Sequence, residues 1–300
     1  MVALPKDETP KASPVHNKAP VKYFGGKQSL VPTLLSLVPP HDTYIEVFGG
    51  AGSLLFSKYP SPLEVYNDIN SGLVNFFRVL RDPQQCKELQ RLLNLTPYSR
   101  EEYLDCRSSW RNITDPVEKA RRWYVNVQMC FAGFVGRTGW SNCLTSNGHA
   151  PRKFRNNTEA LTHFSRRLLN VQIENQDFAT IFKTYDNANA FFYCDPPYLP
   201  ETRRDGSYPD ETTEADHIHL LELATSCKGK VIISGYDSPL YRDMLTGWRL
   251  VTFQTVAQSA AHTEVNGLKG KGVMKVKQAR TECIWLKPNT IQQASLWEGL

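Results

Sequence analysis

The stretch that decides the fold is Thr43-Tyr44-Ile45-Glu46-Val47-Phe48-Gly49-Gly50-Ala51-Gly52. Residues 43–48 form a mainly apolar run typical of a strand, and glycines follow where the backbone must turn sharply. A short helix is expected over residues 53–58, and a second strand over residues 63–66 ends at Asn67-Asp68. Because two strands joined by a glycine turn and a helix make a βαβ unit, the sequence predicts a parallel sheet.

Further strand patterns lie on the far side of a long helical region. Strands are expected over residues 171–174, 190–194, 230–234, 249–256 and 282–286, with a helix over residues 214–226. Another helix is expected from residue 29 to the proline pair at 39–40, because prolines end helices. We therefore predict an α/β fold, with a Rossmann-like doubly wound sheet and a mostly helical insertion between its second and third strands.

The insertion is expected to span residues 71–170. Ser99 with Glu102 reads as a capping box, and Asp115-Pro116 places a cap before a first-turn proline. A glycine-rich segment at residues 133–142 interrupts the helical pattern and predicts a hairpin or loop. The domain division predicted is thus a disordered leader at 1–20, a discontinuous sheet domain at 21–70 and 171–290, and the insertion.

Composition sets wide bounds on function. The chain has 300 residues, 41% of them apolar, and a formal charge of +5, which permits a polyanionic partner without requiring one. Its seven cysteines form no C-x-x-C pair and no zinc-ligand spacing, so we expect reduced thiols and no metal. No apolar run approaches the roughly 18 residues of a membrane helix, and the leader lacks a signal peptide's apolar core. We expect a cytoplasmic protein.

The glycine turn predicts a site for an adenosyl ligand. Glycines between a strand and a helix let backbone N–H groups approach a ligand, and Asp68 ends the next strand. An acid at that place binds ribose hydroxyls in Rossmann-type sheets. The spacing differs from the dinucleotide pattern, which disfavours NAD or FAD, and from the P-loop. The other interpretation is a glycine turn required only for packing.

A second motif, Asp195-Pro196-Pro197-Tyr198, follows the apolar run at residues 190–194. The prolines end strand pairing and stiffen the exit, so a carboxylate, two carbonyls and a ring are fixed at the strand's carboxyl end. Ligands bind at that edge in open α/β sheets. Taken alone, the tetrad also fits a simple proline turn.

Together these motifs resemble those of one enzyme family. In order, they are residues 23–27 (Tyr-Phe-Gly-Gly-Lys), 46–52, 67–70 (Asn-Asp-Ile-Asn) and the tetrad at 195–198. The chain is similar to D12-class, Dam-like adenine-N6 DNA methyltransferases of the alpha group, over residues 21–288. The resemblance implies a methyltransferase sheet that binds S-adenosylmethionine and a target-recognition insertion. It implies methyl transfer to the exocyclic N6 amine of an adenine flipped out of duplex DNA.

The resemblance also assigns roles in the cofactor site. Lys27 would meet the charged end of the cofactor, Asp68 the ribose, and Ile69 the adenine face; Tyr23 stands where the family usually has Trp. The full set of cofactor residues implied is Tyr23, Phe24, Gly25, Gly26, Lys27, Glu46, Phe48, Gly49, Gly50, Ala51, Gly52, Ser53, Asp68, Ile69, Asn70, Asp177, Phe178 and Asp195.

The tetrad would carry the chemistry. The lone pair of the adenine amine is delocalised, so the amine is a poor nucleophile. Asp195 and the Pro196 carbonyl would each accept one N–H bond and aim the lone pair at the methyl group, a catalysis by positioning and placed charge. Pro197 would keep the turn rigid, and Tyr198 would stack on the flipped base.

DNA contacts are expected from the insertion. Of two further loops, 200–216 would close over the flipped base and 262–280 would follow the DNA backbone. The residues proposed for DNA contacts are Arg137, Trp140, Asn142, Arg152, Lys153, Arg155, Lys269 and Lys271, and Arg166 and Arg167 are further candidates for phosphate contacts. The alternative for each is an ordinary solvated side chain.

Three alternatives to this function stay open. Two are enzymes, a cytosine-N4 methyltransferase and an RNA adenine methyltransferase, and the third is a catalytically silent DNA-binding relative. For the leading interpretation we expect a monomer, encoded by a bacterium or phage and associated with the nucleoid. Restriction-modification, protection of a mobile element and regulation are all compatible with the sequence.

Overall fold

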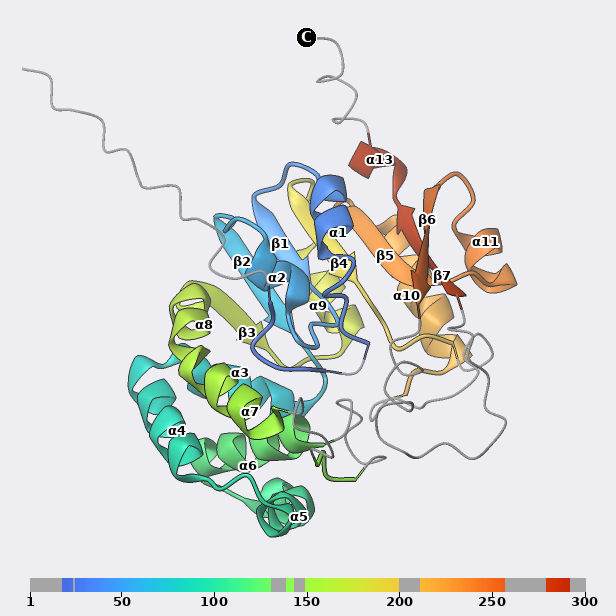
Figure 1. The fold of residues 1–300 in the computed structure, drawn as a ribbon. Helices are drawn as coiled ribbons and strands as arrows, with labels where there is room; N and C mark the ends of the chain where they lie inside the picture. The colour runs from blue at the N-terminus through green and yellow to red at the C-terminus, as the bar shows by residue number, and fades with distance from the viewer. Residues whose placement is uncertain are drawn as a thin grey trace, which may run out of the picture.

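Seven strands form one sheet in the computed structural model, which describes residues 18–23, 25–130, 139–142, 149–199, 211–256 and 279–291 (Figure 1). The strands are β1 (Thr43–Glu46), β2 (Leu63–Asn67), β3 (Val171–Glu174), β4 (Ala190–Cys194), β5 (Lys230–Tyr236), β6 (Arg249–Val256) and β7 (Ala279–Leu286). Their order is β3-β2-β1-β4-β5-β7-β6. The predicted α/β class is confirmed.

The strand order places a crevice at the carboxyl edge of the sheet. Strands β1 to β5 pair in parallel, while β7 is antiparallel to both β5 and β6. The chain moves outward from β1 to β2 and β3, then returns to pair β4 with the other side of β1. Between β1 and β4 the order reverses, and such a reversal opens the crevice in which ligands bind.

Both faces of the sheet are covered, because alternate side chains of a strand point to opposite faces. In β4, Phe191 and Tyr193 belong to one apolar core, whereas Phe192 and Cys194 belong to the other. The first core includes α1 (Val31–Leu37) and α2 (Ser53–Ser57); the second includes α9 (Phe178–Tyr185), α10 (Glu214–Ser226) and α11 (Pro239–Met244). The short α13 (Pro288–Ile291) follows β7.

The region between β2 and β3 is helical, as expected. It contains α3 (Ser71–Arg81), α4 (Pro83–Leu95), α5 (Arg100–Ser109), the 3-10 turn η1 (Trp110–Asn112), α6 (Pro116–Met129), α7 (Ala150–Glu159) and α8 (Leu161–Leu168), gathered at the lower left of Figure 1. The predicted caps are present, since Ser99 accepts from Glu102 N–H and Asp115 accepts from Glu118 N–H. Each cap satisfies a backbone donor that a helix start leaves free.

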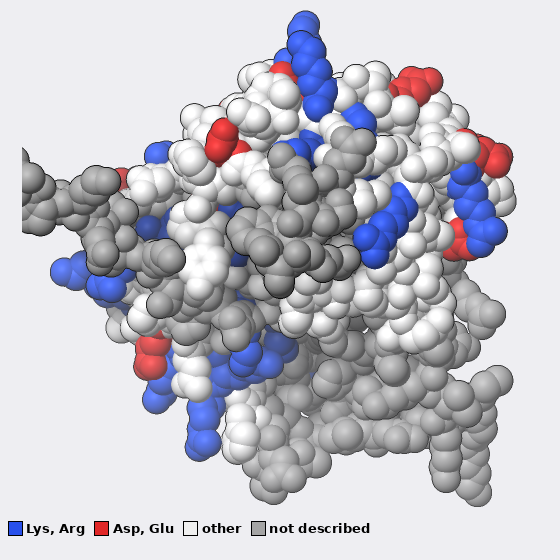
Figure 2. Space-filling view, turned by 90° about the horizontal axis from the view of Figure 1, so that it is seen from above, with Lys and Arg blue, Asp and Glu red and all other residues white. Residues whose placement is uncertain are grey.

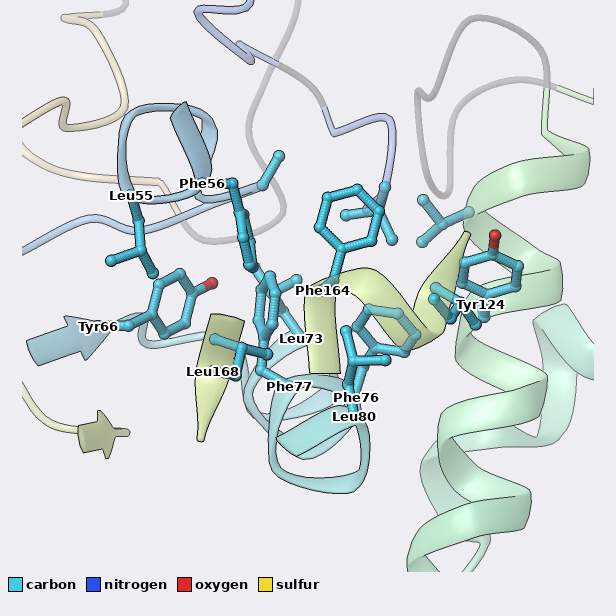
Figure 3. Packing of buried hydrophobic residues seen from close by; sticks show 14 of the residues in the cluster. Leu55, Phe56, Tyr66, Leu73, Phe76, Phe77, Leu80, Tyr124, Phe164 and Leu168 are labelled. Atoms are coloured by element: carbon cyan, nitrogen blue, oxygen red, sulfur yellow. The ribbon is translucent and has the colours of Figure 1, made fainter. Parts of the chain in front are cut away.

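These helices share the apolar core of the sheet. Phe77 of α3 lies 4.6 Å from the Tyr66 ring of β2, and Phe164 of α8 meets Phe56 of α2 edge-on at 5.1 Å (Figure 3). Phe76 stacks on Tyr124 of α6 at 5.4 Å. The helical region is therefore anchored directly to the strands that form the carboxyl edge.

A buried ion network ties α8 to β2. The Arg167 guanidinium pairs with both carboxylate oxygens of Glu64 and also donates to the Leu55 carbonyl at 2.9 Å. Lys58 Nζ lies 2.7 Å from the same carboxylate. Burial raises the pKa of Glu64, but Arg167 and Lys58 outweigh it and hold the pKa below its usual value. The expectation that Arg167 contacts phosphates is wrong, because Glu64 holds this side chain in the interior.

Strand ends differ modestly from the predicted ones. Strand β1 stops at Glu46, two residues early, because the chain bends there into the glycine turn. Strand β5 is longer than expected because it pairs with β7 as far as Tyr236–Glu282. Strand β7 is longer because its residues 279–281 pair with β6. No helix in the described part of the chain has the length and apolar content of a membrane span.

Candidate active site

A cavity of about 250 Å³ opens at the carboxyl ends of β1, β2 and β4. Sixteen of the predicted site residues line it, namely Tyr23, Gly25, Gly26, Lys27, Glu46, Phe48, Gly49, Gly50, Ala51, Ser53, Asp68, Ile69, Asp177, Phe178, Asp195 and Pro197. Eight other described residues also line it: Val47, Leu54, Asn67, Gln176, Tyr193, Glu211, Thr212 and Asp216. Sequence positions almost 200 residues apart thus share one cavity.

The glycine turn is packed against β2. A Cβ atom on Gly49 would lie 2.2 Å from the Tyr66 ring, so this position accepts no side chain without displacing a buried aromatic. The Tyr66 hydroxyl donates to the Gly50 carbonyl at 2.6 Å. Gly50 and Gly52 have positive φ angles of 49° and 69°, which glycine adopts without steric cost. The turn is therefore fixed by β2 before any ligand binds.

Asp68 braces the same turn. One carboxylate oxygen accepts from Gly50 N–H at 2.8 Å, and the other accepts from Asn70 N–H at 2.8 Å. Ile69 exposes 57% of its surface beside it. The Asn70 side chain instead caps α3, accepting from Gly72 and Leu73 N–H groups. Asn70 is not among the described residues that line the cavity, and its side chain serves as the N-cap of α3.

Asn67 belongs to the 67–70 motif, but the sequence pattern assigned it no role in the site. Its buried amide donates to the Val47 carbonyl at 2.9 Å and to the Gln176 carbonyl at 3.1 Å, and its oxygen accepts from Gln176 N–H at 2.9 Å. The Asn67 side chain at the end of β2 therefore holds together the backbone segments that follow β1 and β3. Its place at the end of β2, next to Asp68, was the available signal.

Asp177 and Phe178 border the cavity beyond β3. Asp177 is the N-cap of α9 and accepts from Ala179 N–H at 2.8 Å. The Phe178 ring packs on Phe48 at 5.8 Å. Together with Ile69, these rings give the outer part of the cavity an apolar wall.

Glu46 is a buried acid at the inner end of the cavity. Its Oε2 accepts from the Tyr44 hydroxyl at 3.0 Å and from Leu55 N–H at 3.1 Å. Burial raises the pKa of Glu46 to about 8, and the nearby charge of Asp195 adds to the rise. The carboxyl therefore keeps its proton up to a pH of about 8 in the folded protein.

The tetrad follows β4, and its acid is paired. Asp195 Oδ1 lies 3.1 Å from Lys27 Nζ, and both side chains are largely buried. Burial raises the pKa of Asp195, while the Lys27 charge opposes that rise. Pro197 lines the cavity, whereas Pro196 is buried behind it.

Tyr198 is held by Glu282, a second residue that the motif search left out of the site. The Tyr198 hydroxyl donates to Glu282 Oε2 at 2.8 Å and lies 3.3 Å from Asp195 Oδ1. Lys27 Nζ sits 4.5 Å from the centre of the Tyr198 ring and 4.0 Å from Glu282 Oε2. The predicted base-stacking ring is thus 4% exposed and covered by an ammonium group. Lys27, Asp195, Tyr198 and Glu282 form the catalytic-edge cluster.

A family model described as D12 class N6 adenine-specific DNA methyltransferase matches residues 23–258. The chain belongs to this family. It is an adenine-specific DNA methyltransferase, and the predicted family and enzyme class are confirmed.

Curated relatives agree with the family match. The Type II methyltransferase M1.LlaDCHI of Lactococcus lactis subsp. cremoris is 29% identical over 264 residues, covering 82% of this chain and 90% of that protein. The DNA adenine methylase of Escherichia coli (strain K12) is 25% identical over 239 residues, or 76% and 84% of the two chains. The Type II methyltransferase M.MjaIII of Methanocaldococcus jannaschii is 28% identical over 201 residues, or 60% and 68%.

The candidate DNA contacts of this methyltransferase lie in different settings. Arg152, Lys153 and Arg155 are exposed on α7, and Asn142 is exposed beside Ser141. Phe24 of the cofactor set and three DNA candidates, Arg137, Lys269 and Lys271, lie outside the described residues. Figure 2 shows a face on which Lys and Arg side chains gather at the lower left and elsewhere alternate with acids.

Trp140 is built into the helical region. Its backbone bridges to Cys130, its ring packs on Tyr98 at 5.7 Å, and the Arg100 guanidinium lies 4.9 Å above it. Tyr98 also donates its hydroxyl to the Ser141 carbonyl at 2.6 Å. Arg100 was absent from the sequence candidates because nothing near it in the chain marks it as a partner of Trp140.

Proposed function

We propose that this methyltransferase uses S-adenosylmethionine to methylate the N6 amine of an adenine flipped out of duplex DNA. The observation that carries the proposal is the position of Asp195. Its carboxylate shares one cavity with the glycine turn and Asp68, so an amine acceptor and an adenosyl-type pocket meet at one sheet edge.

The residues of the cavity fit an adenosyl group bearing a charged amino-acid end. Ile69, Phe48 and Phe178 offer apolar surface for the adenine, and Asp68 offers acceptors for ribose hydroxyls. Glu46 and the turn at residues 49–52 would hold the methionine end. The cofactor, when bound, supplies an electrophilic methyl group on a sulfonium sulfur.

The chain's own contribution is to position the amine. Asp195 and the Pro196 carbonyl would each accept one N–H bond, leaving the nitrogen lone pair free to form the new N–C bond. The methyl–sulfur bond would break in the same displacement, with its electron pair left on sulfur. The proton that the amine then loses would pass to Asp195 or to water. Positioning of this kind contributes up to roughly 7–11 kcal/mol in favourable systems.

Tyr198 would stack on the flipped base. Such a stack is worth about 1–3 kcal/mol, comparable with the cost of unstacking a base from the duplex. The ring face is covered by the Lys27 ammonium, so Lys27 must move when a base enters. Glu282 would keep the Tyr198 hydroxyl in place during that exchange.

The insertion at residues 71–170 would read the DNA, and the sheet domain would carry the chemistry. The exposed cations of α7 suit phosphates. Trp140 and Asn142 belong to the glycine-rich segment at residues 133–142, which we propose for base contacts. We also propose that the enzyme is a monomer in the bacterial cytoplasm. The Type II names of two relatives suggest a role in restriction-modification.

The test is to incubate the purified protein with S-adenosylmethionine and duplex DNA and to map modified bases by long-read sequencing. We expect N6-methyladenine within one short sequence context. Methylated cytosine, or methylation confined to RNA, would contradict the proposal. Cofactor binding and DNA binding without any transfer would indicate a silent relative.

A further inference from the structure

A buried chain of hydrogen bonds ends on the tetrad at the Pro197 carbonyl. The Tyr241 hydroxyl lies 2.8 Å from His217 Nδ1, and His217 Nε2 lies 3.0 Å from Thr212 Oγ1. Thr212 Oγ1 donates to the Pro197 carbonyl at 2.9 Å. Tyr241 is 2% exposed and His217 is 1% exposed. We call these four groups the Thr212 relay.

The direction of each bond in the relay is set by its acceptor end. The Pro197 carbonyl can only accept, so the Thr212 hydroxyl donates its only proton to that carbonyl. Thr212 must then accept from His217, which places the imidazole proton on Nε2. An imidazole that carries its single proton on Nε2 accepts at Nδ1, and the Tyr241 hydroxyl then supplies that proton. Burial raises the pKa of Tyr241, so this hydroxyl keeps its proton.

The relay is anchored in two helices. Thr213 caps α10 in a capping box with Asp216, which fixes the backbone beside Thr212. His217 lies in the first turns of α10, and Tyr241 lies in α11, where it donates its N–H to Ser238. The relay therefore transmits the position of two packed helices to a single carbonyl of the tetrad.

The Pro197 carbonyl matters because its orientation determines the backbone conformation next to Tyr198. Proline already has a restricted φ, so holding the Pro197 carbonyl also fixes its ψ, and with it the peptide leading to Tyr198. The Tyr198 hydroxyl is held at its other end by Glu282. Thr212 and Pro197 both line the cavity, so the relay ends at the cavity wall.

We propose that His217 and Thr212 are positioning residues for methyl transfer, which set the tetrad so that the Tyr198 ring and the Pro196 carbonyl point into the target-base site. This rests on the proposed function of the tetrad. Neither residue touches the reacting atoms. A displacement of about 1 Å at a catalytic group can cost about 100-fold in rate, so the relay acts on turnover more than on ligand affinity.

The test compares Thr212→Val, which removes the hydroxyl at nearly constant size, with Thr212→Ser, which keeps it. We expect Thr212→Val to lower single-turnover methyl transfer by about 10- to 100-fold, with cofactor and DNA affinities within about threefold of wild type. Thr212→Ser should recover most of the rate. Thr246→Val is the matched control, since Thr246 donates to the Asp243 carbonyl at an exposed site.

A second variant tests whether His217 and Thr212 act together, and melting temperatures separate positioning from folding. His217→Phe should lose rate like Thr212→Val, and the double variant should lose little more, because both substitutions break one relay. Melting temperatures of the Thr212 variants should match that of Thr246→Val. Full rate in Thr212→Val, or losses that multiply in the double variant, would overturn the relay. A wild-type protein that binds DNA but transfers no methyl group would overturn the proposed function as well.

Discussion

Lys27 Nζ lies 3.1 Å from Asp195 Oδ1 and 4.5 Å from the centre of the Tyr198 ring. The Lys27 ammonium group therefore occupies the place that the proposed mechanism gives to the adenine amine. It contacts Asp195, the carboxylate that would accept a hydrogen bond from that amine. The family resemblance implies that Lys27 meets the charged end of the cofactor. Its contacts here connect it to the acid and the ring of the tetrad.

The first prediction concerns the pH dependence of Lys27→Met. Burial raises the pKa of Asp195, and the Lys27 charge counteracts that effect. Transfer needs ionised Asp195, so activity falls as the pH drops through this pKa. Without Lys27 the pKa rises further, and the acid limb of the profile of log kcat/KM against pH should move to higher pH. Lys183→Met, at an exposed site on α9, is the control. An acid limb that stays in place would contradict the prediction.

The second prediction concerns Glu46 and stability. The native protein holds a proton on Glu46 up to a pKa of about 8, whereas the unfolded chain releases it near 4.5. The unfolded state thus binds fewer protons, and the free energy of unfolding should fall as the pH rises from about 4.5 to about 8. The slope from one proton is at most about 1.4 kcal/mol per pH unit.

Glu46→Gln should remove this part of the slope. Urea denaturation at several pH values would measure it, with Glu222→Gln on the exposed face of α10 as the control. Equal slopes in the wild type and in Glu46→Gln would show that Glu46 is ionised in the folded protein.

The third prediction concerns the buried ion network. Arg167→Met leaves Glu64 with a buried charge that Lys58 alone must balance. Breaking such a pair typically costs about 3–5 kcal/mol, because the remaining charge stays desolvated. Arg242→Met breaks an exposed pair with Asp237 and should cost less than about 1 kcal/mol. Chemical denaturation compares the two, and similar losses would show that the network contributes little.

The sheet edge could be predicted because local chemistry marks it. Gly49, Asp68 and Asp195 each follow an apolar strand, and carboxyl ends of parallel strands meet at one edge. The helix caps could also be predicted, since Ser99 and Asp115 accept hydrogen bonds from backbone N–H groups only three residues away. In each case the relevant partner is close in sequence or fixed by the topology.

Other parts of the site depend on long-range register. Glu282 reaches Tyr198 across 84 residues, because antiparallel pairing places it opposite Tyr236, whose ring meets Tyr198. Arg167 resembled a surface cation until its partner Glu64, 103 residues away, was placed beside it. Thr212 shows the same limit, since only the folded chain tells a residue of the cavity wall from an ordinary loop residue.

The most direct test of the central claim is single-turnover methyl transfer by Asp195→Asn, measured with labelled S-adenosylmethionine on duplex DNA that the wild type methylates. Asparagine keeps the size of the side chain but replaces one acceptor oxygen with a donor. We predict a loss of at least about 100-fold in rate, with DNA binding retained. A variant that transfers methyl groups as fast as the wild type would contradict the account.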